Sequence, residues 1–420
     1  MSANKEIKKT EARSSLAKMF GGSAFQSLLI PTLAVFIGLV IGGLVIAATD
    51  AGVAEAFKNF SSDPGAAFKS IWTAIATAYG ALFYGSLGSP REIIAGFKAL
   101  QATGDNDAFL KAIYPLTESL VTATPYIFAG LAVAIGFRCG LFNIGAEGQF
   151  FMGALGAAYV GYSLKGLPWF VHLPLAILGG GLAGAIWGAV PGYLKAKFGA
   201  HEVVNTIMMN WIAFRLSDWL LTGPMMTAGF RPVTPNIQKT AELPRFFEDP
   251  LRFNWGFVLA LVVAWLVYWF LFKTTLGFEI RSVGANPDGS KYAGMSVVRN
   301  FVLVMVLSGA LAGLAGSAQV LGVDHWVGQG FSAGYGFDAI ALALLGKSHP
   351  LGVVLSAILF GILRSGATRM QSLAGIPIDI ISIIQGLVII FVAAPAIIRW
   401  LFRIRISTGD ETVLTRGWGK

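Results

Sequence analysis

Long apolar runs separated by short polar segments recur along almost the whole chain. Many approach or reach the ~20 residues that an α-helix needs to cross a ~30 Å hydrocarbon layer. We predict ten membrane-spanning segments, at residues 28–48, 118–137, 144–164, 172–194, 203–222, 255–273, 300–322, 336–347, 350–366 and 380–402. The eighth segment is too short to span as a straight helix, so we expect a half-helix buried within the protein.

The polar parts of the pattern divide the chain further. We expect a cytoplasmic segment at 1–27, a first transmembrane helix at 28–48, an exterior insertion at 49–117, a helical core at 118–402 and a cytoplasmic tail at 403–420. The apolar run after the basic N-terminal segment is longer than the core of a signal peptide, so it predicts an uncleaved span. Amphipathic stretches in the insertion, such as AAFKSIWTAIATAYGALFYGSL, are able to lie on or dip into the membrane surface. The pattern leaves open whether any of it spans.

Composition and charge agree with a membrane protein. The 420 residues are 55% hydrophobic and 13% charged, and the mean hydropathy is +0.67. The net charge of +9 lies mainly at the chain ends and in short loops, which favours membrane orientation over nucleic-acid binding. The positive-inside rule places both termini in the cytoplasm, together with Arg138, Lys195, Lys197, Lys273, Arg281, Arg299, Lys347, Arg399, Arg403 and Arg405.

Glycines recur at helical spacing within the spans. Gly180, Gly184, Gly188 and Gly192 repeat every four residues, and the pairs Gly38 with Gly42 and Gly309 with Gly313 have the same spacing. Such spacing leaves one helix face as bare backbone, which lets a second helix approach closely. The pattern therefore predicts a tightly packed helical bundle.

Several familiar chemistries are disfavoured. The single Cys139 excludes a disulfide within the chain and a cysteine-based metal site, and the four histidines, His172, His201, His325 and His349, have no metal-ligand spacing. ALALLGKS, residues 341–348, has Ala341 where a phosphate-binding loop requires glycine. GFSAG, residues 330–334, matches the nucleophile elbow of hydrolases, but the elbow needs a preceding strand and a positioned base. A membrane-embedded hydrolase using Ser332 remains a remote alternative, and we expect no metal or cofactor.

The polar stretch TTLGFEIRSVGANPDGSKYAGM, residues 274–295, is the longest one assigned to the cytoplasmic side. Asn286 is suited to cap a helix, Pro287 to begin it, Asp288 to interact with its positive end and Gly294 to stop it. A helix of about two turns is marginal alone in water. We therefore favour a docking element over a solvated connector.

The stretch GLFNIGAEGQFFMGALGAA, residues 140–158, carries polar groups at the start of a span. One interpretation is local: Asn143 caps a helix that begins at Ile144, the helix dipole stabilises Glu147 and Arg138 pairs with it. The other is functional, because polar residues in broken membrane helices often line a substrate path. Candidates for that path are Asn143, Glu147, Gln149, Asn205, Asn210 and Asp338, with Gln385 as a further polar position.

Three motifs carry a resemblance to a known family: GLFNIGAEGQFFMGALGA, EVVNTIMMNWIA at 202–213 and RSVGANPDGSKYAGM at 281–295. Together they resemble bacterial ABC-transporter permease subunits of the simple-sugar and nucleoside uptake group, which is related to ribose and branched-chain amino-acid permeases. The resemblance covers roughly residues 117–402. It implies an all-α integral membrane protein with about ten transmembrane helices, in inverted repeats of about four to five helices, with 118–402 as the permease core.

The resemblance also implies partners in the bacterial cytoplasmic membrane. These are a second related permease subunit, a cytoplasmic ABC ATPase that hydrolyses the ATP, and an exterior substrate-binding lipoprotein; surrounding lipid is expected and nucleic acid is not. In such permeases the segment at 277–295 docks on the ATPase. The matching positions here are Gly277, Glu279, Arg281, Gly284, Asn286, Pro287, Asp288, Tyr292 and Gly294.

One departure from the family pattern lies at 288–291, where DGSK replaces a commonly alanine-rich stretch. Gly289 is expected to weaken that short helix by up to ~1 kcal/mol relative to alanine. The resemblance implies a nucleoside as the substrate, with simple sugars next, and the few charges within the spans suit an uncharged solute better than an ion. Branched-chain amino acids or another small solute remain alternative substrates. A passive channel remains a remote alternative class of protein.

Overall fold

The computed structural model describes residues 23–104, 106–229, 231–332 and 334–402, and every regular element in these ranges is helical. The described chain divides into two compact units. The first comprises the residues up to Ala78 and those from Ile376 onward, and the second extends from Tyr79 to Gly375. The division falls within one helix, α4 (Pro64–Leu87).

The first unit contains α2 (Ser23–Thr49), α3 (Ala51–Lys58), the beginning of α4, α16 (Asp379–Ala393) and α17 (Pro395–Leu401). Gly38 of α2 lies against α16, where a methyl group would approach the Val388 side chain to 2.8 Å. The predicted span at 380–402 is interrupted, because Ala394 leaves helical geometry, with a φ of −117° and a ψ of 68°, before Pro395. A proline lacks the amide hydrogen that a helix requires, and it disfavours helical geometry at the residue before it.

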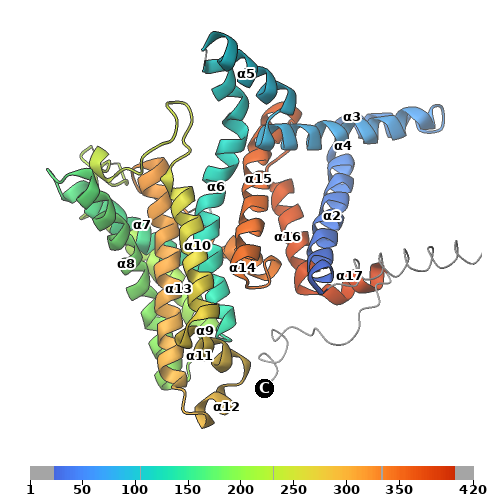
Figure 1. Ribbon diagram of the computed structural model, residues 1–420. Coiled ribbons are helices and arrows are strands. Elements are labelled where there is room, and N and C mark those ends of the chain that lie inside the picture. Colours follow the sequence, from blue (N-terminus) through green and yellow to red (C-terminus); the bar gives the residue numbers. More distant parts are fainter. Residues whose placement is uncertain (1–22, 105, 230, 333, 403–420) are drawn as a thin grey trace, which may run out of the picture. The chain divides into compact units, whose positions relative to one another are not determined.

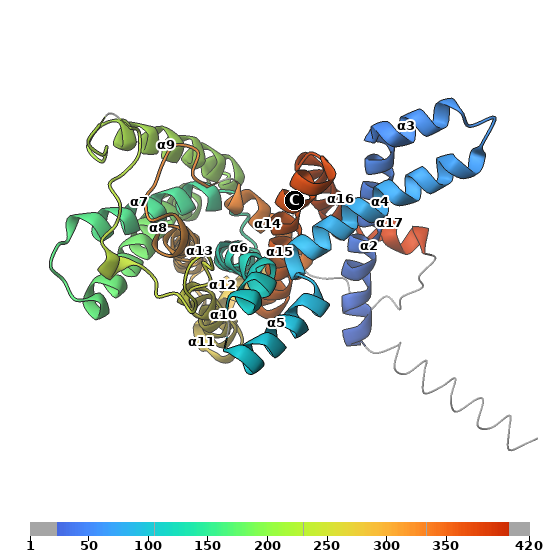
Figure 2. The ribbon, with the colours of Figure 1, turned by 90° about the horizontal axis from the view of Figure 1, so that it is seen from above.

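The second unit holds the long helices α6 (Asp107–Arg138), α8 (Trp169–Phe198), α10 (Trp255–Lys273), α13 (Val297–Gln319) and α15 (Pro350–Ala374) (Figure 1). Its remaining elements are α5 (Pro90–Thr103), α7 (Ala146–Ser163), α9 (Glu202–Thr222), the 3₁₀ turn η1 (Lys239–Ala241), α11 (Thr275–Ala285), α12 (Pro287–Tyr292), the π-helical η2 (Val320–Asp324) and α14 (Tyr335–Leu345). Figure 2 shows the helices of this unit from above.

Each predicted membrane segment contains a helix of the structure. Among the described residues, six helices are long and apolar enough to cross a membrane, and the shorter helices α14 and α16 are also apolar. The half-helix prediction is confirmed by α14, which has 11 residues. The chain is thus an all-α, multi-pass membrane protein, while the count of ten crossings stays a prediction.

The region at 49–117 differs from a simple insertion. It folds into α3, α4, α5 and the beginning of α6, which starts at Asp107 instead of residue 118. Within the second unit the end of α4 packs on the bundle, because the Ser119 hydroxyl of α6 donates to the Ser86 carbonyl at 2.7 Å. Residues 107–117 therefore extend α6 beyond the predicted span at 118–137.

The glycine ladder of α8 lies against α13, as the spacing predicts. A methyl group at Gly184 would lie 2.7 Å from the Cα of Gly313, and one at Gly188 would lie 3.0 Å from the Cα of Gly309. These distances are too short for any side chain, so the two helices meet backbone to backbone. The ladder thus fixes how closely α8 and α13 approach each other.

Helix contacts in the second unit have an internal symmetry. α8 packs on α13 as α15 packs on α6, and α7 packs on α13 as α14 packs on α6. In Figure 1, α6 descends from α5 and α13 rises from α12, so these two helices run in opposite directions. Exchanging α6–α7–α8 with α13–α14–α15 reproduces the contacts, as inverted repeats would.

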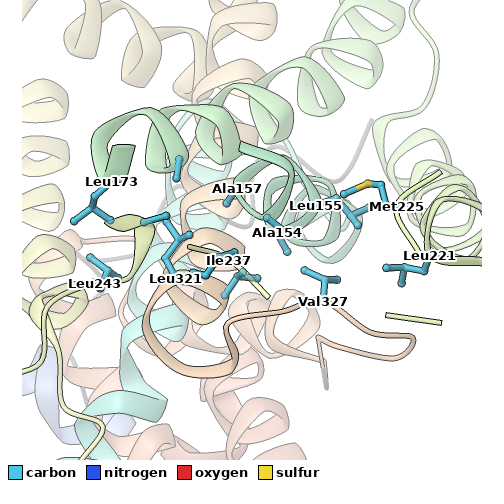
Figure 3. Packing of buried hydrophobic residues seen from close by; sticks show 14 residues of the cluster. Ala154, Leu155, Ala157, Leu173, Leu221, Met225, Ile237, Leu243, Leu321 and Val327 are labelled. Carbon is cyan, nitrogen blue, oxygen red and sulfur yellow. The ribbon is translucent and has the colours of Figure 1, made fainter. Parts of the chain in front are cut away.

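A hydrophobic cluster anchors the long segment between α9 and α10 (Figure 3). Met225, Ile237 and Leu243 of that segment pack with Leu155 of α7 and Leu321 of η2. Backbone bonds reinforce the contact, since the Leu243 amide donates to the Leu321 carbonyl at 2.8 Å. The segment therefore forms a fixed cover over one end of the bundle.

Candidate functional site

The connector between α6 and α7, residues 139–145, is held by a buried network of amides and a hydroxyl. The Asn143 side-chain amide donates to Gln149 Oε1 and to Ser308 Oγ, both at 2.8 Å. Ser308 of α13 in turn donates to the Ala132 carbonyl of α6 at 2.6 Å. These side chains are almost completely buried, so the network ties α6, α7 and α13 together.

The predicted cap of α7 is wrong in detail. The helix begins at Ala146, two residues later than the expected Ile144. Its N-cap is Gly145, which has no side chain to cap the helix. Asn143 instead accepts the Gly145 amide at 2.9 Å, which is the local turn that asparagine commonly forms with the backbone two residues on. Its side chain therefore shapes the connector.

Asn210 of α9 supports the same connector. Its Oδ1 accepts the Gly148 amide at 2.8 Å, and its Nδ2 donates to the Ile144 carbonyl at 3.0 Å. It thereby satisfies one backbone donor in the first turn of α7 and one carbonyl of the connector. Asn205, on the same helix, has a buried Nδ2 without a hydrogen-bond partner among the described residues.

Glu147 lies in the first turn of α7 and contacts the beginning of α14. Its carboxylate accepts the Gly336 amide at 2.6 Å and the Ser332 hydroxyl. The first turns of two helices thus converge on one acid, and the positive ends of both helix dipoles favour its charge. Only 3% of Glu147 is exposed.

Arg138 does not pair with Glu147, which corrects the local interpretation of this motif. Its guanidinium donates to the carbonyls of Ser348 at 2.9 Å and Lys347 at 3.2 Å, just beyond the end of α14. A cation near the carboxyl end of a helix interacts favourably with the helix dipole. Glu147 and Arg138 therefore hold the two ends of α14.

A second polar cluster joins α6, α14 and α15. The Tyr126 hydroxyl donates to Asp338 Oδ2 at 2.7 Å, and Arg364 Nη1 lies 3.2 Å from the same oxygen. Arg364 also donates to the Tyr126 hydroxyl at 2.6 Å, and its guanidinium lies 4.9 Å from the centre of the Tyr335 ring. The side chains of Asp338 and Arg364 are 30% and 31% exposed.

The sequence prediction found Asp338 but missed Arg364, Tyr126 and Tyr335. Arg364 lies near the end of the predicted span at 350–366, where an arginine reads as an interfacial residue. A charge within a membrane segment almost always pairs with another charge or faces a water-filled cavity. This rule could have marked Arg364 as a residue with a charged partner, but that partner, Asp338, lies on another helix.

The serine of GFSAG serves a structural contact in this fold. Ser332 lies in a turn instead of between a strand and a helix, and its hydroxyl donates to Glu147. This is not the arrangement of a nucleophile elbow. The described residues also contain no group of three or more His, Cys, Asp or Glu that could hold a metal ion.

The polar segment after α10 forms two short helices. The prediction for α12 is confirmed: the Asn286 side chain accepts the Gly289 amide at 3.0 Å, Pro287 begins the helix, Asp288 lies in its first turn and Gly294 follows its end with a φ of 84°. All of its residues except Ser290 are exposed, and Tyr292 is 97% exposed. α12 therefore projects from the bundle.

The preceding helix, α11, is fixed to the bundle at several points. Gly277 packs so closely on the last turn of α10 that a methyl group would overlap the Phe270 and Leu271 carbonyls. Arg281 donates to the Leu271 carbonyl at 3.0 Å. A methyl group at Gly284 would lie 2.8 Å from the Cys139 carbonyl carbon, so α11 touches the connector that leads to Glu147.

Glu279 links α11 to the beginning of α13. Its Oε2 accepts the Asn300 side-chain amide at 3.1 Å and pairs with Arg299 at 2.7 Å. The Asn300 and Arg299 hydrogen bonds lower the pKa of Glu279 below its ordinary value. The segment that carries α12 is thus joined to α6, α10 and α13.

Comparison with known families identifies the chain. A family model described as "Branched-chain amino acid transport system / permease component" matches residues 116–393. The chain belongs to this permease family. The matched region begins in α6 and ends at the last residue of α16, so it includes Glu147, the Asp338 cluster and α11–α12.

The most similar relatives include three ABC transporter permeases. A guanosine permease of Bacillus subtilis is 36% identical over 89% of this chain and 95% of its own length. A nucleoside permease of Lactococcus lactis is 31% identical over 89% of this chain and 93% of its own length. A glucose permease of Haloferax volcanii is 36% identical over 67% of this chain and 77% of its own length.

These permeases also occur in pairs. The same Bacillus and Lactococcus strains each have a second guanosine or nucleoside ABC permease, 27% and 29% identical to this chain. No solved structure matches the chain.

Proposed function

We propose that this permease is one of two transmembrane subunits of an ATP-driven importer for nucleosides, with simple sugars as the second candidate. The guanosine and nucleoside permeases align with nearly the whole chain, which supports the first substrate class. The glucose permease supports the second class. The chain itself supplies the path and the coupling, and a partner ATPase supplies hydrolysis.

The observation that carries this proposal is the exposed helix α12 on an anchored base. A helix as short as α12 has little stability alone in water. Its exposed surface, which includes Tyr292, is suited to dock in a groove on a soluble partner. The residues proposed to couple to the ATPase are those predicted from the sequence, from Gly277 to Gly294. Within this set, Asp288 and Tyr292 are suited to touch the ATPase, and Glu279, Arg281 and Gly284 to hold the base.

We assign the end of the bundle that carries α12 to the cytoplasm. Four basic residues lie near this end: Arg138, Arg281, Arg299 and Lys347. Arg138 bonds the Ser348 and Lys347 carbonyls, Arg281 bonds the last turn of α10, and Arg299 pairs with Glu279 of α11. Such an accumulation of basic residues is typical of the cytoplasmic side. Of the remaining predicted cytoplasmic positions, the 1–22 part of the N-terminal segment and the tail with Arg403 and Arg405 lie outside the described residues.

The path is proposed to run beside α14. Asp338 borders it directly, and Glu147 holds the beginning of the same half-helix. Asn143, Gln149 and Asn210 shape the connector behind it, while Asn205 is a further polar position on α9. Access would alternate because ATP binding favours one of two arrangements of the subunits through differential contacts. The contact of Gly284 with the connector offers a route from α12 to α14.

The test is reconstitution of this chain with a second permease, the ATPase and the exterior binding lipoprotein in liposomes. We expect nucleosides to stimulate ATP turnover and to accumulate inside only when ATP is present on the cytoplasmic side. Replacing Tyr292 by Ala should lower turnover at least tenfold while leaving the melting temperature of this chain unchanged. Nucleoside flux without ATP would instead indicate a passive channel and refute the proposal.

A further inference from the structure

The Asp338 carboxylate uses its two oxygens unequally. Both hydrogen bonds of this group, from Tyr126 and from Arg364, fall on Oδ2. Among the described residues Oδ1 has no hydrogen-bond partner, and it is not one of the buried polar atoms that lack one. One oxygen is thus fixed by the protein and the other is accessible, on a side chain that is 30% exposed.

The surroundings of this carboxylate fix its orientation. Tyr126 is completely buried, and its ring packs edge-to-face on Tyr335 with 4.7 Å between the ring centres. Tyr335 in turn stacks on Phe150 of α7 at 5.7 Å. A carboxylate held by a packed tyrosine and an arginine has little freedom to rotate, so the accessible oxygen has a defined position before any solute arrives.

We propose that Asp338 Oδ1 accepts a hydrogen bond from a sugar hydroxyl of the transported solute, with Tyr126 and Arg364 as positioning residues. This inference rests on the proposed function and names the chemistry of its path. An ionised carboxylate is acceptor-only, so its ligand must bring a donor. The ribose hydroxyls of nucleosides and the hydroxyls of simple sugars are such donors, and a carboxylate is a known partner of ribose hydroxyls in nucleotide-binding folds.

The local charge agrees with a neutral solute. Asp338 and Arg364 are a close ion pair, so the site presents no net charge to an incoming molecule. Two charges within a membrane segment and one-third exposed cannot face hydrocarbon without a large cost. They fit an aqueous path, in which a hydroxyl replaces the water bound to Oδ1 at little cost in hydrogen bonding.

The experiment compares two solutes in the complete reconstituted transporter. Guanosine and 2′,3′-dideoxyguanosine differ only in the ribose hydroxyls, and the KM of each is measured from ATP-dependent uptake. The binding lipoprotein is the same in every sample, so its own preference cancels when the KM ratio of a variant is divided by that of the native protein. Glucose and its deoxy analogues are tested in the same way.

Asp338→Asn is expected to raise the KM of guanosine by about tenfold or more and to leave that of the dideoxy analogue within about twofold, since a hydrogen bond to a charged group is lost only with the solute that carries the 2′- and 3′-hydroxyls. Tyr126→Phe keeps the ring and removes one bond to Asp338. The Tyr126→Phe variant should therefore lose part of the native difference in KM between guanosine and its dideoxy analogue. Assembly with the partner subunits is checked by co-purification for both variants.

The outcomes separate the two levels of the proposal. If the native transporter moves neither nucleosides nor sugars, the proposed function fails. If it moves nucleosides but both variants keep the native KM ratio, Asp338 does not read the hydroxyls and this inference is overturned. Loss of co-purification in Asp338→Asn, together with a native ratio in Tyr126→Phe, would make the ion pair a subunit contact and would also overturn it.

Discussion

Gly336 donates its backbone amide to the Glu147 carboxylate at 2.6 Å, and the two residues approach so closely that a methyl group on Gly336 would overlap the Glu147 backbone. The beginnings of α7 and α14 therefore meet without an intervening side chain. This contact relates the two proposed repeats, since α7 and α14 occupy equivalent places in them.

We expect Gly336→Ala to destabilise the protein by about 1–3 kcal/mol, because overpacking a close backbone contact forces the helices apart. Gly80→Ala is the matched control, since a methyl group at Gly80 of α4 has no neighbour within 4 Å. Thermal unfolding of the purified protein in detergent measures both. Equal melting temperatures for the two variants would contradict the close contact.

Ser332→Ala removes the hydroxyl that donates to the Glu147 carboxylate. We expect a loss of about 1–3 kcal/mol in stability, because a buried acceptor is left partly unsatisfied, together with measurable residual transport. A hydrolase that used Ser332 as its nucleophile would lose all activity without this loss of stability. Melting temperature and ATP-dependent uptake, measured on the same preparation, separate these two results.

The glycine ladder offers two substitutions one turn apart on α8. Gly184→Ala should cost about 1–3 kcal/mol, because the methyl group would lie 2.7 Å from the Gly313 Cα. Gly181→Ala should be neutral or slightly stabilising, since the nearest atom of Leu314 would be 3.5 Å away. Denaturation of both variants in the same detergent tests the ladder. A Gly181 variant as unstable as the Gly184 variant would contradict this assignment, because alanine has the higher helix propensity and cannot destabilise the helix by itself.

Stability near α11 should depend on pH through Glu279. The pKa of this group is lowered by hydrogen bonds from Asn300 and Arg299, so its ionised form favours the folded state. Its contribution is fully present above the ordinary pKa of 4.5 and is lost as the pH falls through the lower folded pKa. Glu279→Gln should therefore flatten the acidic part of a curve of unfolding temperature against pH.

Arg299→Gln is the companion of that measurement. It removes the Arg299 contribution while keeping the Asn300 bond, so the acidic decline should move toward pH 4.5 without disappearing. A curve identical to that of the native protein for both variants would mean that Glu279 has the same pKa in the folded and unfolded chains.

Much of the fold follows from local signals in the sequence. Hydropathy placed a helix within every predicted segment, because a membrane helix must bury its backbone polar groups over a fixed length. The bounds of α10 and the capping of α12 agree closely with the structure, since Asn286, Pro287 and Gly294 act within a few residues of their own positions. Glycine spacing likewise predicted a close contact of α8 with another helix.

What the sequence did not provide are partners distant along the chain. The short distance along the chain favoured a pair of Arg138 with Glu147, nine positions later, yet Arg138 bonds carbonyls more than 200 positions away. The Asp338 cluster draws on α6, α14 and α15, and no periodicity connects those three helices. The break before Pro395 was a local signal, but the apolar run on both sides concealed it.

The backbone contact between α8 and α13 has a mechanical consequence. Where carbonyls and Cα atoms touch directly, there are no rotamers that can rearrange to absorb a displacement, and close-packed atoms resist compression. α8 and α13 must then move together as one rigid body. Compliance in this unit is left to helices that are bridged by side chains.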